Sequence, residues 1–196
     1  MNSKIVKHMA AAAAAAVVAG AANAAVVTWN LNMVVPANID GLYINVETGA
    51  TGATGGVTAG WDINPYSATA LTFFNATGTG MMRYPGVTTG SAGSLAQGTS
   101  VNSAANLAGT GTVTFGAVAG NWTLNASNYF GFKFLAADGL THYGVGRMDV
   151  GATATVRTIA YVSYETVAGA EIIVTPAPGA IALLGLAGLA GRRRRN

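Results

Sequence analysis

The stretch "YFGFKFL", from Tyr129 to Leu135, decides the fold of this chain. Its three phenylalanines, Phe130, Phe132 and Phe134, stand two residues apart. Because successive side chains of a β-strand point to opposite faces of the sheet, all three share one face when the segment is extended. The stretch therefore predicts a strand that buries an aromatic face in the core of a β-sheet protein.

The same two-residue alternation of apolar and polar residues occurs on both sides of this stretch. It predicts six further strands, at residues 28–33, 42–47, 112–115, 141–150, 153–163 and 171–174. Turns rich in Gly, Asn and Thr separate these strands, and the pattern predicts an all-β fold with a single antiparallel β-sandwich or jelly-roll-like domain. Two Gly-rich segments, Thr48–Gly60 and Gly86–Gly98, are predicted to be loops at the ends of the sandwich.

The composition predicts one folded domain with a mildly acidic body. The chain has 196 residues, no cysteine and only 9% charged residues, so neither a disulfide framework nor a thiolate metal site is available. Its net charge is +3, but between Ala25 and Pro178 four basic residues stand against seven acidic ones, a net charge of −3. The body has no basic stripe with interleaved aromatic residues, which argues against nucleic acid as a partner.

Residues 1–24 have the three parts of a secretory signal peptide. Two lysines form a positive n-region, and the 12 residues from Met9 to Gly20 form an apolar stretch. Ala22 and Ala24 are the small residues three and one positions before a cleavage site, so we expect cleavage before Ala25. An Ala-rich helix of the folded domain is the alternative, but this run has no polar face.

The chain closes on an apolar run followed by four arginines. A helix over residues 179–191 has 13 residues and spans about 20 Å, less than a hydrocarbon core about 30 Å thick. The arginines predict that this end stays on the cytoplasmic side of a membrane, so an exported body lies on the other side. A plain C-terminal membrane anchor is one interpretation of this tail. The orienting residues are Arg192, Arg193, Arg194 and Arg195.

A sorting tail is the other interpretation. The motif Pro176-Ala177-Pro178, the apolar helix and the terminal arginine cluster together resemble the PEP-CTERM sorting tail, over residues 175–196. Ala177 stands where that family usually has Glu. The resemblance implies export through the general secretory machinery of a Gram-negative-type bacterium, transient anchoring in the inner membrane and recognition by an exosortase. It also implies a final place at the cell surface or in the exopolysaccharide matrix of a biofilm.

The body between these segments, residues 25–174, also carries a resemblance. Five of its stretches are similar to a recurrent body of exported proteins with this tail, and that body has no established chemistry. This second resemblance supports the location and the fold. The stretches are "IDGLYINVETGAT" (39–51), "GWDINPYSATALTFFN" (60–75), "YFGFKF" (129–134), "THYGVGRMDV" (141–150) and "AYVSYETVAGAEI" (160–172).

One short segment of the body is a candidate ligand site. Asp62 and Asn64 stand two residues apart and can offer two oxygens to Ca²⁺. Trp61 and Tyr66 flank this pair and can form an aromatic platform for a sugar. The pattern raises the hypothesis of a calcium-assisted carbohydrate-binding module, but Asn64-Pro65 is also a turn signal, and an Asp often caps a turn with its own side chain.

A secreted hydrolase is the third hypothesis, centred on His142, the only histidine of the body. Asp138 or Asp149 could orient its ring, but no G-x-S-x-G nucleophile motif accompanies it. A structural hydrogen bond after the Asp138-Gly139 turn is the alternative. Glu165 and Glu171 could form a glycosidase carboxylate pair, or they could be solvated charges at strand ends.

The sequence thus predicts an exported, non-enzymatic surface or matrix protein without a resident cofactor. Its best-defined positions are those of signal cleavage, at Ala22, Ala24 and Ala25, and those of the sorting tail. Carbohydrate binding and hydrolysis are the alternatives, in that order.

Overall fold

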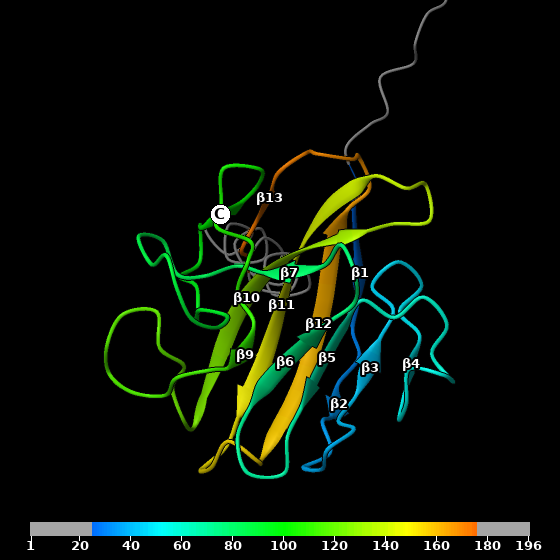
Figure 1. Ribbon diagram of the computed structural model, residues 1–196. Helices are drawn as coiled ribbons and strands as arrows, with labels where there is room; N and C mark the ends of the chain where they lie inside the picture. Colours follow the sequence, from blue (N-terminus) through cyan, green and yellow to red (C-terminus); the bar gives the residue numbers. More distant parts are fainter. Residues whose placement is uncertain (1–24, 176–196) are drawn as a thin grey trace, which may run out of the picture.

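The computed structural model describes residues 25–175, and all of its regular secondary structure is β (Figure 1). The predicted all-β, antiparallel class is confirmed for these residues. They contain no helix, so none of them forms one that is long and apolar enough to cross a membrane. The predicted signal segment and the predicted helix of the tail lie outside the described residues.

The largest sheet has six strands, and three of them are long. Its order is β1–β12–β11–β10–β7, and β2 also pairs with β12. Every pairing in it is antiparallel. The strands are β1 (Val26–Trp29), β2 (Met33–Val34), β7 (Gly80–Met81), β10 (Ala126–Leu135), β11 (Thr141–Val150) and β12 (Arg157–Glu165).

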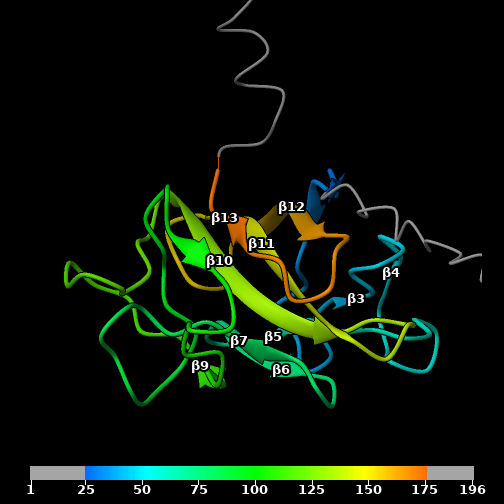
Figure 2. The same cartoon turned by 90° about the horizontal axis from the view of Figure 1, so that it is seen from above.

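Two smaller sheets lie on opposite sides of the large one (Figure 2). A five-stranded sheet has the order β4–β3–β5–β6–β9, and a two-stranded one pairs β13 with β8. The strands of the first are β3 (Tyr43–Ile44), β4 (Thr51–Gly52), β5 (Ile63–Tyr66), β6 (Thr72–Asn75) and β9 (Gly111–Thr112). Those of the second are β8 (Ser100–Val101) and β13 (Ile172–Ile173).

The main core lies between the six-stranded and the five-stranded sheet, an arrangement consistent with a β-sandwich. Ile63 and Phe73 from the five-stranded sheet pack in one buried cluster with Phe130 and Phe132 of β10. The three phenylalanines of the 129–135 stretch are fully buried and share this cluster, so the aromatic face predicted from the sequence is confirmed. A second cluster covers the opposite face of β11, where Tyr143 and Val145 pack under β8 and β13.

Two glycines of β11 make room for these rings. The register sets Phe130 opposite Gly146 and Phe132 opposite Gly144. A Cβ atom at Gly146 would lie 2.3 Å from Cζ of Phe130, and one at Gly144 would lie 2.3 Å from Cζ of Phe132. Bare backbone at these two positions of β11 thus leaves room for the rings of Phe130 and Phe132, which favours this register of the hairpin.

We expect Gly146→Ala to destabilise the fold by about 2 kcal/mol, because the Phe130 ring is enclosed by other core side chains and cannot move aside freely. Urea denaturation measures the loss. Gly56→Ala is the matched control, since the nearest atom to a Cβ there is 4.0 Å away. Equal urea midpoints for the two variants would contradict this account of the hairpin.

A bulge in β12 aligns its core residues. The pairing with β11 runs Arg147 with Tyr161 and then Met148 with Ile159, so Ala160 is left over. The extra residue shifts the two-residue period by one. As a result Ile159 and Val162, three positions apart, both reach the main core.

Several predicted elements are wrong in their extent. The predicted strand 28–33 is two short strands, separated at Asn32, which has a left-handed φ of 48°. The predicted loop 48–60 contains β4, which pairs with β3 and makes the loop part of the sheet. The predicted strand 153–163 begins only at Arg157, because 153–156 form the turn from β11. The predicted strand 42–47 shrinks to β3, and the predicted strand 112–115 shares only Thr112 with β9.

Candidate functional site

The residues of the predicted signal-cleavage site and of the predicted sorting tail lie at or beyond the ends of the described structure. Ala25 is the first described residue. The other cleavage residues, Ala22 and Ala24, lie outside the described residues, as do Pro176, Ala177 and Pro178 and the cluster from Arg192 to Arg195.

The members of the predicted ligand site differ in their burial and in their hydrogen-bond partners. Asp62 and Asn64 are buried, whereas Trp61 and Tyr66 are half-buried. Oδ2 of Asp62 accepts the backbone N–H of Val46 at 2.8 Å. Nδ2 of Asn64 donates to the carbonyl of Asp40 at 2.7 Å. Each side chain therefore serves its own backbone partner, and within residues 25–175 no group of three His, Cys, Asp or Glu side chains could hold a metal ion.

The Asn64-Pro65 pair is not a turn, contrary to the turn signal in the sequence. Both residues belong to β5, where Pro65 stands opposite Phe73 of β6. The carbonyl of Pro65 accepts the N–H of Leu42. Proline has no N–H to donate, so toward β3 Pro65 acts only as an acceptor, and the paired register of β3 and β5 contains only Ile44 and Ile63. The chain turns only after Tyr66, where Ser67 has a φ of 106°.

Trp61 belongs instead to an aromatic cluster with two residues that the sequence analysis did not single out. Its ring contacts that of Tyr43 edge-on, with 4.9 Å between the ring centroids, and its centroid lies 5.5 Å from that of the Phe74 ring. Phe74 is 53% exposed. It alternates along β6 with the core residue Phe73, so this aromatic cluster lies on the outer face of the five-stranded sheet. Tyr66 is absent from the ring contacts of Trp61 among the described residues.

Burial makes Asp62 an unusual carboxyl group. Burial raises its pKa from 3.8 to about 6, the hydrogen bond from Val46 acts in the opposite direction, and the charge of Glu47 raises it further. The pKa of an aspartate in the unfolded chain remains near 3.8. The folded state therefore holds the proton more tightly, and the free energy of unfolding decreases as the pH rises through this interval.

We expect the wild-type protein to lose about 2 kcal/mol of stability between pH 4 and pH 7 through this group. Asp62→Asn keeps an oxygen for the Val46 N–H but cannot ionise, so it removes this loss. Urea denaturation at several pH values compares the two proteins. The same slope of stability against pH in both would contradict the assignment.

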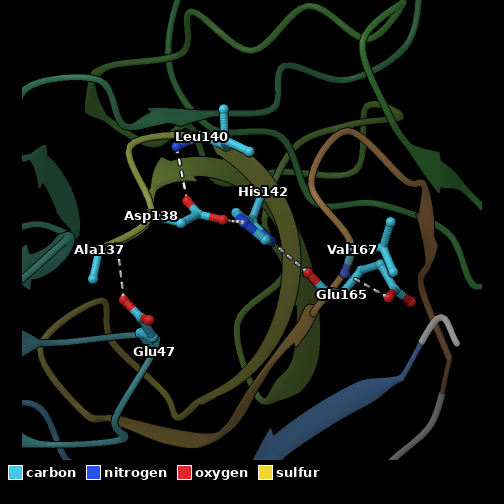
Figure 3. A network of polar contacts seen from close by, with 7 residues as sticks. All are labelled: Glu47, Ala137, Asp138, Leu140, His142, Glu165 and Val167. Carbon is cyan, nitrogen blue, oxygen red and sulfur yellow. Dashed lines mark hydrogen bonds and ion pairs between the residues drawn. The ribbon is translucent and has the colours of Figure 1, made fainter. Parts of the chain in front are cut away.

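His142 lies in the polar network of Figure 3, near the start of β11. Its Nδ1 is 2.9 Å from the carbonyl oxygen of Glu165, and its Nε2 is 3.1 Å from Oδ2 of Asp138. The other oxygen of Asp138 accepts the N–H of Leu140 at 2.8 Å, which closes the Asp138-Gly139 turn. His142 itself is only 4% exposed. The structural hydrogen bond expected after this turn is present.

This geometry favours the doubly protonated ring, because both nitrogens face acceptors. Burial alone would lower the pKa of His142, but the hydrogen bonds to Glu165 and Asp138 outweigh it and raise the pKa above its ordinary value. The stabilisation from this ring is complete in acid and is lost as the pH rises through the raised pKa. The hydrogen bonds from the Leu140 N–H and from His142 lower the pKa of Asp138. The contribution of Asp138 to the free energy of unfolding is therefore lost only as the pH falls through this lowered pKa.

A catalytic histidine that activates a hydroxyl needs one ring nitrogen at the nucleophile and the other at an orienting acceptor. Both nitrogens of His142 are engaged by Glu165 and Asp138. Asp149 does not contact the ring; it accepts hydrogen bonds from Ser127 and Arg147. The arrangement therefore leaves the hydrolase hypothesis without a free base at this histidine.

Glu165 and Glu171 have no partner in common. Glu165 is 4% exposed, and its Oε1 accepts the N–H groups of Ala25 and Val167, each at 3.0 Å. Glu171 is exposed and accepts hydrogen bonds from Ser100 and Asn102. Its interpretation as a solvated strand-end charge holds, whereas the same interpretation is wrong for Glu165. No signal in the sequence marks Glu165 as buried, because it lies beyond the predicted strand 153–163, although it is the last residue of β12.

Glu171 also lines a cleft of about 250 Å³ beside β13. Val26 and Thr28 of β1 line this cleft together with Ile172 and Thr175. The two ends of the described body therefore lie next to each other at one edge of the six-stranded sheet.

Comparisons with known proteins add no relative. Neither a protein-family model, nor a curated protein, nor a solved structure matches this chain.

Proposed function

We propose that this chain is an exported, non-enzymatic protein of the cell surface or extracellular matrix, sorted by an exosortase through its C-terminal tail. Its partners are the secretion machinery, the exosortase and, at its destination, exopolysaccharide. The body is a single jelly-roll-like β-sandwich between a signal peptide and a sorting tail. The proposal rests on the signal-like N-terminus and on the resemblance of residues 175–196 to a PEP-CTERM tail.

One structural observation supports it most: the first and the last described residue are both hydrogen-bonded to residues of the body. At its first residue, the N–H of Ala25 donates to Glu165 and its carbonyl accepts the N–H of Thr166. At its last residue, the carbonyl of Thr175 accepts the hydroxyl of Tyr161 at 2.6 Å. Both ends are held by partners inside the body, so removal of the flanking segments leaves these contacts intact.

The sorting motif provides the direct test. In a host with an exosortase, the wild-type protein is expected outside the inner membrane. A variant with Pro176→Ala and Pro178→Ala is expected to accumulate in the inner membrane fraction. Pro85→Ala, a proline of the body, is the matched control and should be sorted normally. Unchanged distribution of the double variant would contradict the proposal.

Carbohydrate binding is the second candidate function, and the outer-face aromatic cluster favours it. Trp61, Tyr43 and Phe74 offer an apolar surface of the kind on which sugar rings stack, without any need for calcium. Trp61→Ala should then weaken binding to the host polysaccharide at least tenfold, while a chelator leaves it unchanged. Equal binding of wild type and variant would remove this candidate.

A further inference from the structure

Glu165 is a buried carboxylate without a cationic side chain. It is 4% exposed, and among the described residues no Lys, Arg or His nitrogen lies within ion-pair distance of its carboxyl oxygens. The ring of His142 binds its backbone carbonyl and not its carboxylate. Burying a charge without a counter-charge costs free energy, so a cation at this position would stabilise the folded state.

The group that Glu165 does hold is the backbone nitrogen of Ala25. The distance from this nitrogen to Oε1 is 3.0 Å, although the two residues are 140 positions apart. Ala25 cannot drift from this place, because its carbonyl accepts the N–H of Thr166 at 3.0 Å and β1 continues along β12 from Val26. The next residue of the ladder, Val26, stands opposite Glu165 itself.

Ala25 is also the residue that signal cleavage would leave at the N-terminus. Before cleavage its nitrogen is a neutral amide with one N–H. After cleavage it is an α-ammonium group with three N–H donors and a full positive charge at neutral pH. Oε2 of Glu165 accepts no hydrogen bond from a described residue, so it can receive a second N–H.

We propose that Glu165 is the binding site for the α-ammonium group of Ala25, which cleavage after Ala24 creates, and that their ion pair fixes β1 to the edge of the sheet in the mature protein. The inference rests on the processing step of the proposed function. It assigns a role in maturation to a residue of the body, because no side chain among residues 25–175 supplies a cation at this place. The hydrolysed peptide bond supplies the amine, and water supplies the remaining atoms.

The surroundings of the pair contain other charged groups, and a test must separate them. His142 lies against the Glu165 backbone, Asp138 binds the far side of that ring, and Glu47 contributes to the field at both His142 and Tyr164. Glu165→Gln changes the charge of one side chain only. Its amide oxygen can still accept from Ala25 and Val167, so the variant preserves the neutral contacts.

The test is trace acetylation of the exported, processed protein, followed by mass spectrometry. Lys133 is the only lysine of the body, so the processed body offers two amines and Lys133 serves as an internal control. An ion pair keeps the α-amine protonated and unreactive. Relative to Lys133, we expect acetylation of Ala25 at pH 7 to be about tenfold slower in the wild type than in Glu165→Gln.

A second measurement covers the case in which Glu165→Gln does not fold. In the wild type, unfolding in urea should speed the reaction of Ala25 about tenfold relative to that of Lys133. A chain that begins at Ala25 but reacts equally fast in wild type and variant, or in buffer and urea, overturns the ion pair. A chain that begins elsewhere overturns the cleavage assignment on which the inference rests.

Discussion

Arg157→Met should destabilise the protein by about 3–5 kcal/mol, because Arg157 is a fully buried cation that holds several loops together. It is 1% exposed. Its guanidinium donates to the carbonyl oxygens of Ala70, Ala154, Pro36 and Ser67. Burial lowers the pKa of Arg157 to about 10, so the group remains charged at neutral pH.

The partners of Arg157 explain the size of this effect. The carbonyls come from the segment before β3, from the β5–β6 turn and from the β11–β12 turn, so the side chain closes one end of the sandwich. Methionine fills a similar volume but leaves these oxygens without donors. Arg157→Lys should recover little, since an ammonium group cannot reproduce the planar fork of a guanidinium.

Urea denaturation measures the loss, and Arg147→Met is the matched control. Arg147 pairs with Asp149 at 3.0 Å at the surface, where an ion pair contributes about 1 kcal/mol or less. Similar losses for the two methionine variants would contradict the role assigned to Arg157.

Trp122→Ala should also cost about 3–5 kcal/mol, because the indole fills the centre of the main core. Trp122 is 0% exposed and packs against Phe73 and Phe130, with ring centroids at 5.7 and 6.2 Å. Its Nε1 donates to the carbonyl of Ala92 at 3.0 Å. Truncation leaves a cavity and an unpaired carbonyl in one step.

Trp61→Ala is the control for this second variant. Trp61 is half-buried on the outer face, so its loss should cost less than about 2 kcal/mol. Thermal or urea unfolding compares the two variants. If Trp61→Ala were the more damaging of the two, the assignment of core and surface would be wrong. The same Trp61 variant serves the carbohydrate-binding test.

The long strands were predictable because their alternation extends over many residues. The predicted segments 129–135 and 141–150 correspond to β10 and β11, and the aromatic face of β10 points into the core. Strands β5 to β8 were missed; each has only two to four residues, and a run that short has no measurable period by itself. The equally short β3 and β13 were anticipated only as parts of longer predicted strands. The Asn64-Pro65 pair also indicates a turn, because the local sequence does not show that β5 accommodates a residue without an N–H at this position.

The polar sites show the opposite balance. The position of His142 after a turn could be predicted, because Asp138-Gly139 is a local signal. The burial of Arg157 and Glu165 could not, since each depends on partners far along the chain, such as Pro36 at 121 positions and Ala25 at 140 positions. The aromatic cluster of Trp61 was missed in part for the same reason, because Tyr43 and Phe74 come from neighbouring strands.

The central claim is that the two ends of the chain are a signal peptide and a sorting tail, and that the body between them is delivered outside the inner membrane. The intact mass of the protein, recovered from its host by cell fraction, tests this claim most directly. The account predicts a mass that fits a chain from Ala25 to about Pro176, found outside the inner membrane. A mass that fits residues 25–196, found only in the inner membrane, would contradict sorting and leave a plain tail anchor.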